Sequence, residues 1–245
     1  MERINRSVVV IGVASFAVFV VVGLALTQKN DAYCDLEKLE RIYVAIEDLT
    51  SSMDLPCVVT IDGQAQSWRV ALYPYLINDH FALKYDTKQS FDSLSNLNAT
   101  QSLSTSGRGF GLCYYTTKGR LPETQVPSTV LRVTGPRTLG VGLSYRRIER
   151  GLSNIILLIE DPRSRALWTS HEDFDVTTVS DATIISWLHE SRRIALFANG
   201  DIRALSVDTT PKEFRDMCNI DGDKSLPIQN TRLLSSRNKA VRKRG

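Results

Sequence analysis

One uninterrupted apolar run near the N-terminus constrains this chain more than any other feature. Residues 7–26 carry no charged side chain and are mostly Val, Ile, Phe, Ala and Leu. A helix with this sequence is apolar on every face, and about 20 residues at roughly 1.5 Å rise each span the ~30 Å hydrocarbon core of a bilayer. The run therefore predicts a transmembrane anchor, which together with its short leader occupies residues 1–28.

A cleaved signal peptide and the assembly helix of a pilin-like subunit are the alternatives to a fixed anchor. The apolar region of a signal peptide is usually only about 7–15 residues long. This run is longer, although Gly23-Leu24-Ala25 resembles a weak cleavage site. Arg3 and Arg6 precede the run, whereas the residues after it have mixed charge, so the positive-inside rule places the N-terminus in the cytoplasm. We therefore expect a single-pass protein of the cell inner membrane with an extracytoplasmic C-terminal domain.

The rest of the chain divides into an extracytoplasmic domain over residues 29–228 and a basic flexible tail over residues 229–245. The last fourteen residues contain six Lys or Arg and no acid, and removing these six charges from the net charge of +3 leaves −3. Attraction to an anionic surface, or to other envelope proteins, is therefore expected in the tail. A disordered tail that only solubilises the protein is the alternative. No specific nucleic acid is predicted as a partner.

Hydrophobic periodicity predicts a helix directly after the anchor. Apolar side chains recur at three- and four-residue steps, with charged residues between them, at Leu36, Leu39, Ile42, Ala45 or Ile46, Leu49 and Met53. This spacing places them on one face of an amphipathic helix. We expect that face to pack against the sheet of the domain rather than against a partner helix.

Several later segments have the composition of β-strands. The strand-like segments are residues 57–76 around an Asp62-Gly63 turn, 128–135, 154–161 and 192–207. Within the last of them, Asn199-Gly200 predicts a hairpin with a type I′ turn, in which both residues have positive φ. The fold class is therefore α+β.

Two further segments are expected outside the sheet. Residues 92–111 are rich in Ser, Asn, Thr and Gly, which is typical of an exposed connection. Thr210 followed by Pro211 predicts the start of a short helix, because Thr caps helix N-termini and Pro is tolerated in the first turn.

The residues that most often carry catalysis form no recognisable site. His80, His171 and His189 are too widely separated for two of them to share one helix face. The polar cluster from His171 to Asp175 is interpreted as a solvated turn rather than a cation site. The sequence contains no Gly-x-Ser-x-Gly elbow and no phosphate-binding loop. We therefore predict no enzyme activity, no cofactor and no metal.

The four cysteines follow the predicted anchor and contain no Cys-x-x-Cys pair. They are Cys34, Cys57, Cys113 and Cys218. Their spacing argues against a zinc ribbon or a thioredoxin-like motif. An extracytoplasmic compartment permits disulfides, and two bridges or four unpaired buried thiols both agree with the sequence.

Four ordered motifs resemble a bacterial domain of unknown function that is expanded in planctomycetes. The first motif is Ser67-Trp68-Arg69-Val70 followed by Pro74-Tyr75-Leu76, which is similar to the family's Ser-Trp-Arg-Val and Leu-Pro-Tyr-Leu. The other matching residues are Gly151, Ser153 and Asn154 of the second motif, Trp168, Glu172 and Asp173 of the third, and Phe197, Asn199, Gly200 and Arg203 of the fourth, which resembles Phe-Ala-Asp-Gly-Ser-Val-Arg. Together the matches extend from about Leu36 to Pro227.

The resemblance implies a pilin-like layout, because many family members carry a prepilin-type N-terminus. In this layout the transmembrane helix continues into an amphipathic helix that packs on an antiparallel sheet. The chain departs from the family in having no glutamate at the head of its apolar helix, which favours a fixed anchor over prepilin processing. The implied function is a membrane-anchored structural or interaction module of the bacterial cell envelope.

A binding function is the alternative that the resemblance implies. The family has also been labelled solute-binding-like, so the extracytoplasmic domain would then be a small-ligand binding module. In that case we expect an aromatic pocket near Trp68, Tyr75 and Trp168.

Overall fold

The computed structural model describes most of the chain after the predicted anchor. The described residues are 36–49, 58–76, 85–105, 128–139, 151–161, 163–167, 169–189, 193–221 and 231–235. The chain divides into two compact units, Met1–Glu37 and Lys38–Gly245, and nearly all described residues belong to the second. Within them, no helix is both long and apolar enough to cross a membrane. The predicted anchor lies outside the described residues, as do Cys34, Cys57 and Cys113.

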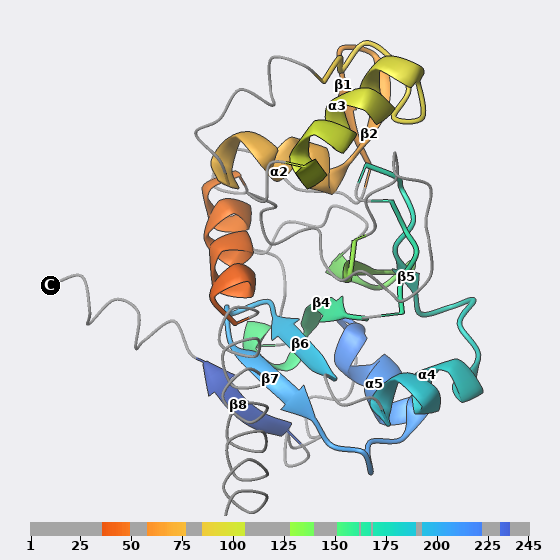
Figure 1. Cartoon of the computed structure of the whole chain (residues 1–245). Helices are drawn as coiled ribbons and strands as arrows, with labels where there is room; N and C mark the ends of the chain where they lie inside the picture. Colours follow the sequence, from red (N-terminus) through yellow and green to blue (C-terminus); the bar gives the residue numbers. More distant parts are fainter. Residues whose placement is uncertain are drawn as a thin grey trace, which may run out of the picture. The chain divides into compact units, whose positions relative to one another are not determined.

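The second unit is built on a six-stranded sheet with the strand order β5-β3-β4-β6-β7-β8 (Figure 1). The strands are β3 (Val130–Thr134), β4 (Ile156–Glu160), β5 (Phe174–Asp175), β6 (Ile194–Phe197), β7 (Ile202–Leu205) and β8 (Thr231–Ser235). Neighbouring strands are antiparallel except for β3 and β5, which are parallel. The predicted α+β class is therefore confirmed.

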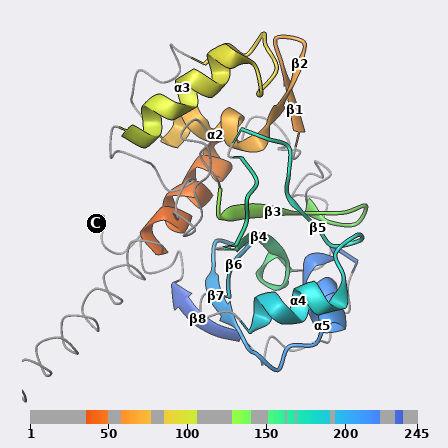
Figure 2. The same ribbon diagram turned by 45° about the vertical axis from the view of Figure 1, so that its right-hand side comes forward.

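One face of the sheet packs against two short helices, α4 (Asp181–Leu188) and α5 (Pro211–Cys218) (Figure 2). Buried apolar side chains of β3, β4, β6 and β7 form one cluster with those of the helices. At its centre the rings of Trp187 and Phe214 lie 5.4 Å apart, and Phe174 packs edge-on against Phe214 at 5.8 Å. Such aromatic pairs contribute about 0.5–1.5 kcal/mol beyond the burial of their surface.

Local hydrogen bonds set the start of both helices. The hydroxyl of Ser180 accepts the amide hydrogen of Thr183 at the start of α4. At α5, Thr210 and Glu213 form a capping box and Pro211 occupies the first turn, where its missing amide hydrogen costs nothing. A cap of this kind stabilises a helix by about 0.5–2 kcal/mol. The predicted helix at Thr210-Pro211 is therefore confirmed.

The helix over residues 36–49 lies on the side of the sheet that faces away from α4 and α5 (Figures 1 and 2). Its buried apolar side chains are Leu39, Ile42, Tyr43, Ala45, Ile46 and Leu49, which confirms the predicted amphipathic stripe over this range. Leu36 is partly buried, and Met53 lies outside the described residues. The Tyr43 hydroxyl donates to the carbonyl of Ala198 at 3.3 Å, and Ser235 of β8 hydrogen-bonds to Glu40. The helix therefore contacts both the β6–β7 turn and the edge strand β8.

A separate two-stranded sheet consists of β1 (Val58–Ile61) and β2 (Gln64–Ser67), which are joined by a two-residue turn. Its two loop residues, Asp62 and Gly63, have φ values of 50° and 81°. Two positive φ values in a two-residue loop define the type I′ geometry that matches the twist of the strands. The predicted Asp62-Gly63 turn is therefore confirmed.

The β6–β7 hairpin forms where the sequence predicts it, but the predicted type I′ turn at Asn199-Gly200 is wrong. Gly200 has a φ of 86°, whereas Asn199 is not among the described residues with positive φ. The Gly200 amide donates to the Phe197 carbonyl at 2.9 Å, and the Phe197 amide donates to the Asp201 carbonyl at 2.8 Å. This pattern is a three-residue loop in which only the last residue is left-handed. The strand register makes the loop one residue longer than the dipeptide alone suggests.

Three segments differ from the sequence-based expectations. Helix α2 (Trp68–Leu76) occupies the second half of the segment expected to be strand, because Trp68 and Arg69 are held by distant polar partners. Helix α3 (Leu94–Thr105) occupies most of the segment 92–111 that was expected to be an exposed connection, and residues 106–111 lie outside the described residues. Here the buried Asn96 amide donates to the carbonyls of Asp86 and Ser90, so side-chain hydrogen bonds rather than an apolar stripe hold the turn before the helix.

The third difference concerns the segment predicted to be a flexible tail. Residues 231–235 form β8, which pairs with β7 in a register that places Leu233 opposite Arg203. Leu233 is half exposed, so backbone hydrogen bonds rather than side-chain burial hold this edge strand. The assignment of residues 229–245 to a tail is therefore corrected for β8, and residues 236–245 lie outside the described residues.

Gly200 and Gly63 form a matched pair of positions at which two effects of an added Cβ on stability can be separated. One effect is the steric clash with a neighbouring side chain, and the other is the strain of a positive φ. Both have positive φ, but a Cβ at Gly200 would lie 2.6 Å from Cε1 of Tyr43, whereas none of the described atoms lies within 4 Å of a Cβ at Gly63. Placing alanine at a positive φ costs about 1 kcal/mol or more of folding free energy. We expect Gly200→Ala to lower the free energy of unfolding by clearly more than Gly63→Ala, as measured by urea denaturation. Equal losses would show that Tyr43 does not pack tightly on the turn.

Candidate functional site

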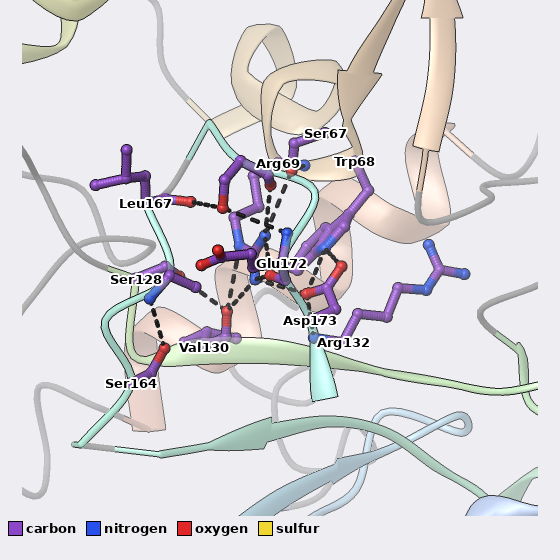
Figure 3. A network of polar contacts seen from close by, with 12 residues as sticks. Ser67, Trp68, Arg69, Ser128, Val130, Arg132, Ser164, Leu167, Glu172 and Asp173 are labelled. Atoms are coloured by element: carbon purple, nitrogen blue, oxygen red, sulfur yellow. Dashed lines mark hydrogen bonds and ion pairs between the residues drawn. The ribbon is translucent and has the colours of Figure 1, made fainter. Parts of the chain in front are cut away.

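An ion pair between Arg69 of α2 and Asp173 lies in the interior (Figure 3). Nη2 of Arg69 is 2.6 Å from Oδ1 of Asp173, and the two side chains are 0 % and 2 % exposed. The two residues are 104 positions apart in the chain. The pair joins two of the motifs singled out in the sequence, Ser67-Trp68-Arg69 and Glu172-Asp173.

Every nitrogen of the Arg69 guanidinium has a partner. Nε and Nη2 donate to the carbonyl of Val130 at 3.3 and 3.0 Å, and Nη1 donates to the Ser67 hydroxyl and to the Ser170 carbonyl, each at 3.4 Å. Nη1 and Nη2 also donate to the carbonyl of Glu172. Backbone carbonyls of two separate segments therefore converge on one arginine.

Asp173 accepts hydrogen bonds from three different residues. Besides Arg69, the indole N–H of Trp68 donates to Oδ2 at 3.0 Å, and the backbone N–H of Arg132 donates to Oδ1 at 2.9 Å. Burial raises the pKa of the Asp173 carboxyl above its ordinary value, while the Arg69 guanidinium, the Arg132 amide and the Trp68 indole oppose this rise. These donors favour the ionised carboxylate in a place where an isolated charge would be very costly.

The local fold explains how these side chains meet. The type I′ turn allows β2 to pair antiparallel with β1. Helix α2 begins at Trp68, immediately after β2 ends at Ser67. Asp173 directly precedes β5, whose first residue Phe174 pairs with Val133 of β3. The β3–β5 pairing thus places Asp173 beside Val130 and Arg132, where Arg69 reaches it. Cζ of Arg69 also lies 4.8 Å from the centre of the Trp68 ring, within the range of a cation–π contact.

This network joins three segments that are far apart in the chain. The side-chain donors of Arg69 and Trp68 and the carboxylate of Asp173 are engaged with one another or with backbone groups. In the described part of the chain, no three His, Cys, Asp or Glu side chains are grouped as metal ligands. The interpretation of residues 171–175 as a solvated turn is corrected for Asp173, whose side chain is 2 % exposed, whereas Glu172 is exposed.

The fourth motif forms a second cluster, at the β6–β7 hairpin. Phe197 is buried, and the guanidinium of Arg203 lies 4.8 Å from the centre of its ring. Nη2 of Arg203 donates to Asp201 at 2.7 Å, and the side-chain oxygen of Asn199 accepts the Asp201 amide hydrogen at 3.1 Å. These residues, together with Gly200, shape the turn against which Tyr43 packs.

The other motif residues lie apart from both clusters. Gly151, Ser153 and Asn154 belong to or border the short 3-10 helix η4 (Leu152–Asn154) that precedes β4. In α2, Val70 is buried, Pro74 and Tyr75 are exposed, and Leu76 is partly buried. Trp168 lies outside the described residues.

The structure separates the residues from which an aromatic pocket was expected. Trp68 is 0 % exposed, with its N–H bound to Asp173, whereas Tyr75 is 48 % exposed on the same helix. The two side chains therefore do not face a common surface. The residues around Arg69 that sequence reasoning did not single out are Val130, Arg132 and Ser170, which act largely through backbone atoms. A charged residue between Trp68 and Val70 was the signal that a buried counter-charge was needed.

Comparisons with known proteins yield no relative: the sequence matches no protein-family profile and no curated protein, and the structure matches no solved structure. The resemblance to the planctomycete domain therefore stays a prediction.

Trp68 and Trp187 allow the contribution of the Asp173 network to be measured. Both indoles are 0 % exposed; the N–H of Trp68 donates to a carboxylate, whereas that of Trp187 donates to the backbone carbonyl of Glu160 at 2.8 Å. Hydrogen bonds to charged groups contribute about 1.5–3 kcal/mol and neutral ones about 0.5–1.5. We expect Trp68→Phe to lower the free energy of unfolding by roughly 1–2 kcal/mol more than Trp187→Phe. Equal losses of unfolding free energy in urea denaturation would mean that the Trp68 N–H does not contribute to stabilising the buried Asp173 carboxylate.

Proposed function

We propose that the protein is a membrane-anchored structural or interaction module of the bacterial cell envelope, with a pilin-like layout and an extracytoplasmic domain. The observation that supports this most is the order of elements at the N-terminus. An apolar run long enough to span a bilayer is followed, after fewer than about ten residues, by the helix over residues 36–49. That helix packs its apolar stripe within the domain and contacts an antiparallel part of the sheet.

The anchor would thus be joined to the domain with almost no linker. Nine residues separate position 26 from position 36, the first described residue of the helix. A segment this short keeps a domain close to the membrane surface, because an extended chain spans at most about 3.5 Å per residue. One feature departs from a bare pilin-like layout: α4 and α5 cover the face of the sheet opposite to the helix.

The small-ligand alternative has less support. It was expected to use Trp68 and Tyr75, and Trp68 is fully enclosed by its contacts with Arg69 and Asp173. The interior around Trp68 therefore supports a structural role for this motif.

The anchor is tested by expressing the full chain in a bacterial host with a periplasm. We expect it in the membrane fraction after alkaline extraction, with an intact N-terminus by mass spectrometry and a domain that external protease digests only after the outer membrane is opened. The matched control is Val13→Arg combined with Val18→Arg, since each arginine costs roughly 2.5–3.5 kcal/mol at the centre of a membrane helix. A soluble wild-type protein, or one cleaved near Leu26, would contradict the proposal.

The tail is tested by deleting residues 236–245, which removes Arg237, Lys239, Arg242, Lys243 and Arg244 but leaves β8 intact. We expect an unchanged melting temperature and the loss of salt-sensitive binding to anionic vesicles, because the attraction is screened beyond ~8 Å at physiological salt. Replacing the five basic residues with Gln is the matched control. A lower melting temperature on deletion, or binding that does not weaken with salt, would contradict an electrostatic tail.

A further inference from the structure

Arg132 of β3 is a second buried arginine, and most of its guanidinium has no hydrogen-bond partner among the described residues. The residue is 2 % exposed, and its Nη2 donates to the carbonyl of Leu139 at 2.9 Å. Nε and Nη1 make no hydrogen bond in the part of the chain that the structure describes. Because Nε carries one N–H and Nη1 carries two, three donors are left unsatisfied next to a full positive charge.

Arg69 shows how this fold satisfies a buried arginine when the partner belongs to the chain. All three of its guanidinium nitrogens are hydrogen-bonded, and Asp173 balances its charge. The Asp173 carboxylate accepts the backbone N–H of Arg132 and also attracts its positive charge, but it accepts no hydrogen bond from the Arg132 guanidinium. Two buried arginines therefore lie beside one carboxylate, and that carboxylate is bound to Arg69.

An arginine cannot relieve this situation by losing its proton, because a guanidinium stays charged at every pH that proteins tolerate. Buried charges are nearly always paired, and a buried polar group without a partner requires a specific explanation. The missing component must therefore be negatively charged and must accept several N–H hydrogen bonds.

We propose that Arg132 binds a small oxyanion, with the chemistry of a phosphate or carboxylate group, through Nε and Nη1. Oxyanion oxygens are the acceptors that a guanidinium binds most strongly. The near-complete burial of Arg132 requires a ligand small enough to be enclosed. This binding site is independent of the proposed envelope function and of the aromatic pocket considered above.

Glu160 provides the competing explanation. It is buried on β4, and its strand position lies on the same face as Arg132, since Glu160 pairs with Val130 and Arg132 pairs with Leu158. If the Glu160 carboxylate turns toward Arg132 in solution, the charge is balanced within the chain and no anion is needed. The experiment therefore includes a variant of each residue.

The test is the melting temperature of the full chain in non-ionic detergent, titrated with sodium phosphate or sodium acetate at constant ionic strength. A ligand that binds only the folded state raises the melting temperature with the logarithm of its concentration above Kd. We expect this rise in the wild type and its loss in Arg132→Met. Without oxyanion, Arg132→Met should melt at or above the wild-type temperature, because it removes an unpaired buried charge.

Arg203→Gln is the matched control, because it removes the same charge from an arginine that is already paired with Asp201 at 2.7 Å. It should keep the rise with oxyanion. If Arg132→Met folds poorly, Arg132→Lys keeps the charge with fewer donors and should show a weakened rise. Equilibrium dialysis with labelled phosphate should find one anion bound to each wild-type chain, and the phosphate and acetate arms identify the preferred group.

Three results would overturn the proposal. An equal rise in the wild type and Arg132→Met would reflect general exclusion of the salt from the protein surface. No rise in the wild type, with Arg132→Met less stable in all buffers, would show that the chain itself satisfies Arg132. A rise that appears only in Glu160→Gln would identify Glu160 as the natural partner.

Discussion

The buried contact between Arg69 and Asp173 is the interaction on which this arrangement depends. It joins the start of α2 to the segment that leads into β5, and the Val130 carbonyl and the Arg132 amide bring β3 into the same network. Three segments that are far apart in the chain thus meet at one guanidinium and one carboxylate. The Trp68 ring and indole N–H complete the network from the same turn of α2.

Such a pair specifies a structure more than it stabilises one. Removing two charges from water costs several kcal/mol per ion, and the attraction between them offsets this only when the remaining donors and acceptors are also satisfied. Around Arg69 they are, since backbone carbonyls accept its other N–H groups. Any other packing of α2 leaves at least one buried charge without a partner. The pair therefore selects one packing of α2 among many apolar alternatives, and this explains why motifs about a hundred residues apart act as one unit.

Features that depend on local chemistry were predictable from the sequence. The capping box at Thr210, the Asp62-Gly63 turn and the amphipathic helix over residues 36–49 each follow from a few neighbouring residues, and all three are present. The candidate site was only partly predictable: the motif residues were identified, but Asp173 was assigned to a solvated turn. Its partner lies 104 positions away, and local composition carries no information about that distance. The sequence did not predict the helix α2 for the same reason. Trp68, Val70 and Tyr73 are equally common in strands, and the distant partners of Arg69 cannot be identified from the local sequence.

A double-mutant cycle between Arg69 and Asp173 tests the central claim most directly. Arg69→Met and Asp173→Leu each leave the other charge buried and unpaired, so each alone should lower the free energy of unfolding by about 3–5 kcal/mol. The double variant removes both charges of the pair and should be less destabilised than the sum of the single losses by roughly 1–3 kcal/mol or more. The coupling energies are measured by urea denaturation. The surface pair Lys212 and Asp216 serves as the reference, and its coupling energy should stay near 0.3–0.5 kcal/mol. Losses at Arg69 and Asp173 that add within ~0.5 kcal/mol would contradict the account.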